Sequence, residues 1–129
     1  MPTFVLDAGA LIAIDRGDRD LMSTLQVAFE NGHEVQAPAG AIGQAWRNPN
    51  RHALLSRVLK RCDEAPLDGA IARSSGQLCG QTGTSDVIDA SVAIAVAAAS
   101  DEGTLLTSDP GDLRNLLAAL HASAEIVKV

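Results

Sequence analysis

Aromatic residues are scarce in this 129-residue chain, which has no tyrosine, one tryptophan and two phenylalanines. Hydrophobic residues still make up 47% of the sequence, so we expect a core built from alanine, valine, leucine and isoleucine. A chain of this length buries roughly two thirds of its unfolded surface. The sequence shows no repeat, linker or low-complexity tract, so we expect one domain spanning residues 1–129.

Long apolar runs and cysteines are also scarce. The longest apolar stretch, residues 90–99, is mostly alanine and falls well short of the roughly 20 residues that a membrane span needs. The first residues lack the basic region and apolar core of a secretory signal. Cys62 and Cys79 are the only cysteines, which favours two buried thiols over a disulfide or a metal site. We therefore expect a cytoplasmic protein that does not associate with membranes.

The net charge of −6 argues at first against nucleic acid as a partner, because phosphate binding relies on lysine and arginine. The charge is unevenly distributed, however. Residues 47–61 contain five of the ten basic residues and no acidic one, which leaves −11 for the rest of the chain. This basic segment is either a phosphate-binding surface or a solvated helix face.

Short β-rich runs alternate with helical patterns along the chain. We expect strands at residues 3–6, 34–37, 64–67, 104–107 and 125–129. Helix boundaries are indicated by Asn31-Gly32 as a stop and by Asn48-Pro49, Asp68, Ser85 and Ser108 or Asp109 as starts. Residues 87–99 contain β-branched residues, but their length and alanine content favour a buried helix. This alternation predicts a parallel sheet covered by helices on both faces.

Acidic residues stand where strand ends and helix starts should converge. Asp7 ends the first apolar run, and Asp86 and Asp89 share one face of the first turn of a later helix. Asp109 and Asp112 follow the buried strand at 104–107. In open α/β sheets, ligands bind beyond the carboxyl ends of the strands. We therefore expect these carboxylates to meet in one crevice.

Two explanations for these acids remain open. Aspartate at a helix start is stabilised by the helix dipole, and for Asp109 or Asp112 taken alone this capping role is the simpler interpretation. Taken together, the acids would repel one another without cations among them. Carboxylates without well-spaced histidines suit Mg²⁺ or Mn²⁺, and we expect His33, His52 and His121 to be surface or loop residues. Such a site best supports phosphodiester cleavage, with the basic segment holding the phosphate backbone.

Three motifs resemble those of the PIN domain, and more narrowly the VapC-like ribonuclease toxins of type II toxin–antitoxin systems. They are Val5-Leu6-Asp7, the segment 86–93 with the sequence DVIDASVA, and Leu106-Thr107-Ser108-Asp109-Pro110. The resemblance covers essentially the whole chain, and the three motifs together are more specific than any one of them. It implies a three-layer α/β/α sandwich around a central, mainly parallel sheet of about five strands. It also implies Mg²⁺- or Mn²⁺-dependent endonucleolytic cleavage of structured RNA such as tRNA or rRNA, dimerisation, and inhibition by a cognate antitoxin protein.

The resemblance assigns catalytic and metal-binding roles to three acids, Asp7, Asp89 and Asp109. Asp86 is then an auxiliary metal ligand one turn before Asp89. The second acid of the family, normally a glutamate in the helix after the second strand, corresponds here to Gln44. Glutamine keeps a carbonyl oxygen but lacks the charge, which weakens cation binding.

The remaining predicted site residues support these acids. We expect Thr107 or Ser108 to orient the acids by hydrogen bonds, and Arg47 and Arg51 to contact the RNA backbone. Because of Gln44, a second hypothesis is a degenerate PIN domain that binds RNA or an antitoxin with little or no catalysis. A phospho-accepting receiver domain would need an acidic pair after the first strand, and a haloacid-type phosphatase would need an aspartate where Gly9 stands.

Overall fold

A computed structural model describes residues 2–99 and 102–129 of the chain. Five strands form one sheet in the order β3-β2-β1-β4-β5, and all neighbouring strands are parallel. The strands are β1 (Phe4–Leu6), β2 (Val35–Pro38), β3 (Asp63–Ala65), β4 (Gly103–Thr107) and β5 (Ala124–Lys128). The predicted parallel sheet of five strands is therefore confirmed, and each predicted strand boundary lies within two residues of the observed one.

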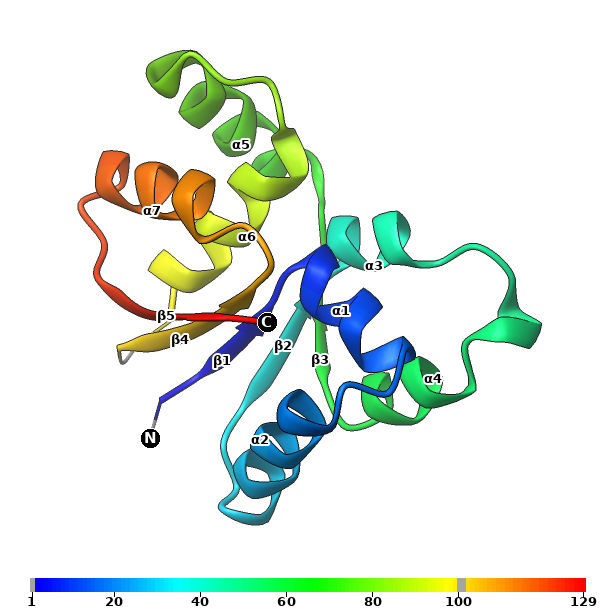
Figure 1. The fold of residues 1–129 in the computed structure, drawn as a ribbon. Coiled ribbons are helices and arrows are strands. Elements are labelled where there is room, and N and C mark those ends of the chain that lie inside the picture. Colours follow the sequence, from blue (N-terminus) through cyan, green and yellow to red (C-terminus); the bar gives the residue numbers. More distant parts are fainter. Residues whose placement is uncertain (1, 100–101) are drawn as a thin grey trace.

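Seven α-helices and one short 3₁₀ turn connect these strands in the described part of the chain. They are α1 (Ala8–Asp15), α2 (Arg19–Glu30), α3 (Ala39–Ala45), η1 (Pro49–Arg51), α4 (Ala53–Leu59), α5 (Gly69–Thr82), α6 (Val87–Ala97) and α7 (Pro110–Ala119). Helices α1 to α4 cover one face of the sheet, and α5, α6 and α7 cover the other (Figure 1). This arrangement follows from right-handed crossovers between parallel strands. It confirms the predicted three-layer sandwich.

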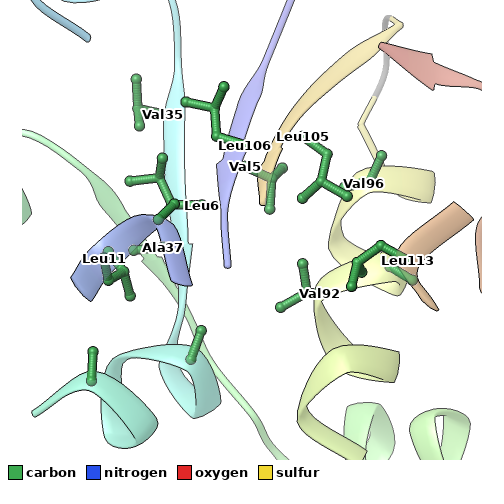
Figure 2. Close-up of a cluster of buried hydrophobic side chains, with 14 of the residues drawn as sticks. Val5, Leu6, Leu11, Val35, Ala37, Val92, Val96, Leu105, Leu106 and Leu113 are labelled. Atoms are coloured by element: carbon green, nitrogen blue, oxygen red, sulfur yellow. The ribbon is translucent and has the colours of Figure 1, made fainter. Parts of the chain in front are cut away.

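The central strands are buried on both faces, and their side chains alternate between two halves of the core. Leu6 and Leu106 point toward α1, whereas Val5 and Leu105 point toward α6 and α7 (Figure 2). Each of these four side chains is at most 1% exposed. Strands covered on both faces read as continuous apolar runs. The aliphatic residues of the sequence thus fill the two layers of the core on either side of β1 and β4.

Two predicted helix starts differ from the structure. Asn48-Pro49 opens only the 3₁₀ turn η1, and α4 begins after His52, which occupies its N-cap position. The N-cap of α6 is Asp86, one residue after the predicted Ser85. Its carboxylate accepts the Asp89 N–H at 3.0 Å, and aspartate is among the best N-cap residues. Residues 87–97 form a helix as predicted.

Both cysteines are free thiols, as the sequence predicted. Cys79 is buried and Cys62 is half-buried. Burial, together with the charges of Asp63 and Glu64, raises the pKa of the Cys62 thiol to about 12. This group therefore stays protonated and unreactive at neutral pH. In residues 2–99 and 102–129, we found no helix with the length and hydropathy needed to span a bilayer.

We expect Leu106→Ala to lower the free energy of unfolding by about 2–5 kcal/mol, because it leaves a cavity between the sheet and α1. Leu106 is 1% exposed. Urea denaturation followed by far-UV circular dichroism measures this change. The matched control is Val27→Ala on α2, where the side chain is 55% exposed and the change should stay within about 0.5 kcal/mol. Equal losses in both variants would contradict the assigned core.

Candidate functional site

The candidate site lies between β1 and β4, where the order in which strands are added to the sheet changes direction. Strand β1 is followed by β2 on one side, whereas β4 and then β5 lie on its other side. Leu6 pairs with Leu106, so β1 and β4 end side by side. Asp7 follows β1 directly, and Ser108 and Asp109 follow β4. This is the switch point at which open α/β sheets bind ligands.

Asp7 is buried, with 4% of its surface exposed, and both of its carboxylate oxygens are hydrogen-bonded. Oδ1 accepts the Ala10 N–H at 2.8 Å, which caps α1, and Oδ2 accepts the Thr107 hydroxyl. The Thr107 oxygen in turn accepts the Asp109 N–H at 2.9 Å. Burial raises the pKa of the Asp7 carboxyl above its ordinary value, and these hydrogen bonds oppose that shift. Thr107 thus links the loop after β4 to Asp7.

Ser108 packs against the first turn of α1. A Cβ atom at Gly9 would overlap both Oγ and Cβ of Ser108, so glycine is what allows the loop after β4 to approach α1 this closely. The Ser108 backbone N–H also contributes a hydrogen bond that favours the charged form of Asp7. Both residues predicted to orient the acids therefore lie against Asp7 or its helix.

Three carboxylates lie close together near the loop after β4. One oxygen each from Asp89, Asp109 and Asp112 lies within 4.8 Å of the others. Asp109 occupies the N-cap position of α7, yet its side chain makes no capping hydrogen bond. Asp109 thus stands at a helix start, as the capping interpretation has it, but its carboxylate lies in the cluster and not on a backbone N–H.

The resemblance assigns no role to Asp112, and the structure places it in the acidic cluster with Asp89 and Asp109. A signal for this was present in the sequence. Asp112 follows Asp109 at the i, i+3 spacing that also relates Asp86 to Asp89, and residues so spaced lie on one helix face.

The electrostatics of the cluster are those of crowded like charges. Burial, together with the charges of Asp86, Asp7 and Asp109, raises the pKa of Asp89 to about 7. A hydrogen bond with Asp109 and the charge of that residue raise the pKa of Asp112. A divalent cation would relieve this repulsion, and a donor set of carboxylates alone suits Mg²⁺ or Mn²⁺. The residues present therefore fit such an ion.

Asp7 and Asp86 lie outside the set of three converging oxygens, although their charges act on Asp89. Asp86 is exposed, and one of its oxygens is used to cap α6. Gln44 is exposed on α3, one turn after Gly40. A Cβ atom at Gly40 would lie 2.6 Å from Cδ1 of Ile88, so this side of α3 faces the start of α6. Gln44 therefore lies on the side of α3 that faces the start of α6.

The basic side chains of the predicted segment 47–61 lie in two separate regions of the structure. Arg47 and Arg51 are exposed in and around η1, after the end of α3. The Arg61 guanidinium instead lies 4.2 Å from the centre of the Phe29 ring on α2. His52 is a loop residue between η1 and α4, which the sequence allowed, but it is buried, with 5% of its surface exposed.

Scans of the sequence against protein-family models and against curated proteins gave no match. The fold, in contrast, is similar to that of a chain in the crystal structure of VapBC2 from Rickettsia felis bound to a DNA fragment from their promoter. The alignment has a TM-score of 0.64 and 15% sequence identity, and it covers 98% of this chain and 98% of that chain. The likeness is therefore one of fold over the full length, in line with the fold that the sequence resemblance implied.

We expect the thermal stability of the metal-free protein to fall as the pH rises from about 4 to about 7. The unfolded Asp89 carboxyl titrates near 4 and the folded one near 7, so in this window the folded chain holds a proton that the unfolded chain has lost. Asp89→Asn removes this group. Its Tm should exceed that of the wild type at pH 8, and the difference should shrink toward pH 4.

Thermal unfolding in EDTA, followed by circular dichroism across this pH range, measures the effect. Glu125→Gln, at an exposed position on β5, is the control for loss of one negative charge. A difference between Asp89→Asn and the wild type that did not change with pH would contradict the raised pKa.

Proposed function

We propose that this protein is a metal-dependent endoribonuclease and the toxin of a toxin–antitoxin pair. The observation that carries the proposal is the convergence of Asp89, Asp109 and Asp112, from the starts of α6 and α7, beside the buried Asp7. These acids come from distant parts of the chain and meet at the switch point of the sheet. Capping explains neither the free carboxylate of Asp109 nor the raised pKa of Asp89.

In this proposal, Asp89, Asp109 and Asp112 hold Mg²⁺ or Mn²⁺, with Asp7 and Asp86 adding negative charge beside it. When bound, the ion supplies Lewis acidity toward water and offsets charge on the scissile phosphate. Asp7 lies beside the cluster and acts on Asp89 through its charge. This completes the set of acids, Asp7, Asp89 and Asp109, that the sequence resemblance assigned to catalysis.

The surrounding residues position these acids. Thr107 holds Asp7 with its hydroxyl and Asp109 through its backbone N–H, so one side chain sets the relation between two acids. Asp86 fixes the first turn of α6, from which Asp89 projects. Gln44 offers a neutral oxygen from α3, and Arg47 and Arg51 offer positive charge for the RNA backbone next to an otherwise acidic molecule.

The substrate and partner belong to the same proposal. A structured RNA such as tRNA or rRNA suits a site whose cation attracts phosphate and whose flank carries Arg47 and Arg51. The similar structure is of VapBC2 bound to a DNA fragment from their promoter. Together with the resemblance of the sequence motifs, this supports a cognate antitoxin as a partner. The homodimer in this proposal rests on the resemblance alone, and the cytoplasmic location rests on the sequence.

The second candidate function is a binding module that retains the fold without turnover. It is favoured by one observation, the neutral Gln44 on the side of α3 that faces the start of α6. A missing charge there weakens cation binding, while Asp112 supplies a carboxylate that sequence reasoning did not include in the site. The nuclease therefore remains the better supported function.

We expect Asp109→Asn and Asp112→Asn each to lower the rate of RNA cleavage by about 100-fold, because each removes one charged oxygen from the cluster. The assay follows cleavage of total tRNA with Mg²⁺ or Mn²⁺ on denaturing gels, and Glu125→Gln is again the charge-matched control. Activity in Asp112→Asn equal to that of the wild type would exclude Asp112 from the site, and equal activity in both variants would reject the metal centre.

We expect Gln44→Glu to lower the Mg²⁺ concentration needed for half-maximal cleavage, because it adds a charge on the side of α3 that faces the start of α6. Cleavage measured across a Mg²⁺ titration gives this value for both proteins. If the wild-type chain is inactive at every concentration and Gln44→Glu cleaves, the binding module is the correct function.

A further inference from the structure

The His52 imidazole connects three segments that lie apart in the sequence. Nδ1 lies 2.7 Å from Oδ2 of Asp15, the last residue of α1. Nε2 accepts the backbone N–H of Arg47 at 2.9 Å and that of Asn48 at 3.3 Å. His52 itself is the N-cap residue of α4. One buried ring thus joins the end of α1, the loop after α3 and the start of α4.

These contacts fix the protonation of the ring. A nitrogen that accepts two N–H groups cannot carry a proton, so the imidazole is neutral, and Nδ1–H donates to Asp15. The ring also lies against Trp46, with 4.7 Å between ring centres and 33° between planes. Contacts at both ring nitrogens and at one face of the ring therefore fix the position and orientation of the His52 imidazole.

Arg47 is the residue that this arrangement holds. Its backbone N–H is bound by His52, and its Nη1 donates to the carbonyl oxygens of Gly43 at 3.2 Å and Trp46 at 2.7 Å. Those two bonds use both hydrogens of Nη1. Among the described residues we find no protein acceptor for Nε or Nη2, and Arg47 is exposed. The Nε–Nη2 edge is the one that can bind two phosphate oxygens side by side.

The same contacts tie Arg47 to the acidic site. Asp15 ends the helix that Asp7 begins, and eight helical residues span about 12 Å. Gln44 lies three residues before Arg47, in the last turn of α3. An arginine held by its main chain and by one guanidinium nitrogen loses less entropy on binding phosphate than a free surface arginine does.

We propose that His52 is a positioning residue that holds Arg47 as a contact for one phosphate of the RNA strand. The inference rests on the proposed function, because it takes RNA as the substrate. His52 itself does not touch the RNA. It acts through the Arg47 N–H, and Asp15 acts through His52.

The experiment measures binding of radiolabelled total tRNA to the full chain in EDTA, by filter retention between about 50 and 200 mM NaCl. The logarithm of the association constant falls linearly with the logarithm of salt concentration, with a slope of about 0.9 per phosphate contact on a duplex. Arg47→Ala should reduce this slope by about one contact. Arg73→Ala, an exposed arginine on α5 across the sheet, is the charge-matched control and should keep the wild-type slope.

Two substitutions of His52 separate positioning from folding. Asparagine reproduces Nδ1 and its donor to Asp15 but lacks the acceptor at Nε2, so His52→Asn should lose the same part of the slope as Arg47→Ala. Glutamine places an acceptor near Nε2, so His52→Gln should restore the slope. The double variant His52→Asn/Arg47→Ala should bind no more weakly than Arg47→Ala alone, since both remove one contact.

A wild-type slope in His52→Asn, or effects of the two substitutions that add, would overturn the inference. If His52→Asn does not fold, Asp15→Ala frees the ring without changing the loop, and a wild-type slope in that variant overturns the inference equally. If the protein cleaves RNA and all variants have the same slope, the proposed nuclease function is kept and the positioning role of His52 is rejected. If the protein neither binds nor cleaves RNA, both the nuclease function and the positioning role of His52 are rejected.

Discussion

The hydrogen bond between the Thr107 hydroxyl and the Asp7 carboxylate joins the ends of the two central strands, and the geometry of the acidic site depends on it. Asp7 also caps α1, and Thr107 also accepts the Asp109 N–H. The first helix, the strand end and the start of α7 therefore share one set of buried polar atoms. Removing one partner would leave the others unsatisfied, at a cost of about 1–3 kcal/mol for each buried group.

Like charges above this bond are tolerated because they stand at helix starts. Asp86 accepts a backbone N–H of α6, and Asp89 and Asp112 lie in first helical turns, where the helix dipole favours negative charge. This local support does not cancel the repulsion, because burial and the charges of Asp86, Asp7 and Asp109 still raise the pKa of Asp89. The remaining repulsion is the physical link between fold and function, because a bound cation and the phosphate that it attracts would both be stabilised there.

Much of this fold can be predicted from the sequence because its signals are local. Buried parallel strands appear as short apolar runs, and an aspartate or a glycine marks several helix ends. The same signals place Asp7, Asp89 and Asp109 at strand and helix ends. They could not place His52, because its partner Asp15 is 37 residues away and nothing near position 52 indicates burial. The acids of the sequence also include Asp112, but it lies outside the motif that ends at Pro110, so the resemblance gives it no role.

The contact between Trp46 and His52 gives the protein a built-in optical reporter. The chain has one tryptophan and no tyrosine, so near-ultraviolet absorbance and intrinsic emission come almost wholly from one indole ring. That ring is half-buried and lies 4.7 Å from the imidazole. The emission spectrum consequently follows the loop after α3, with little background from the rest of the molecule.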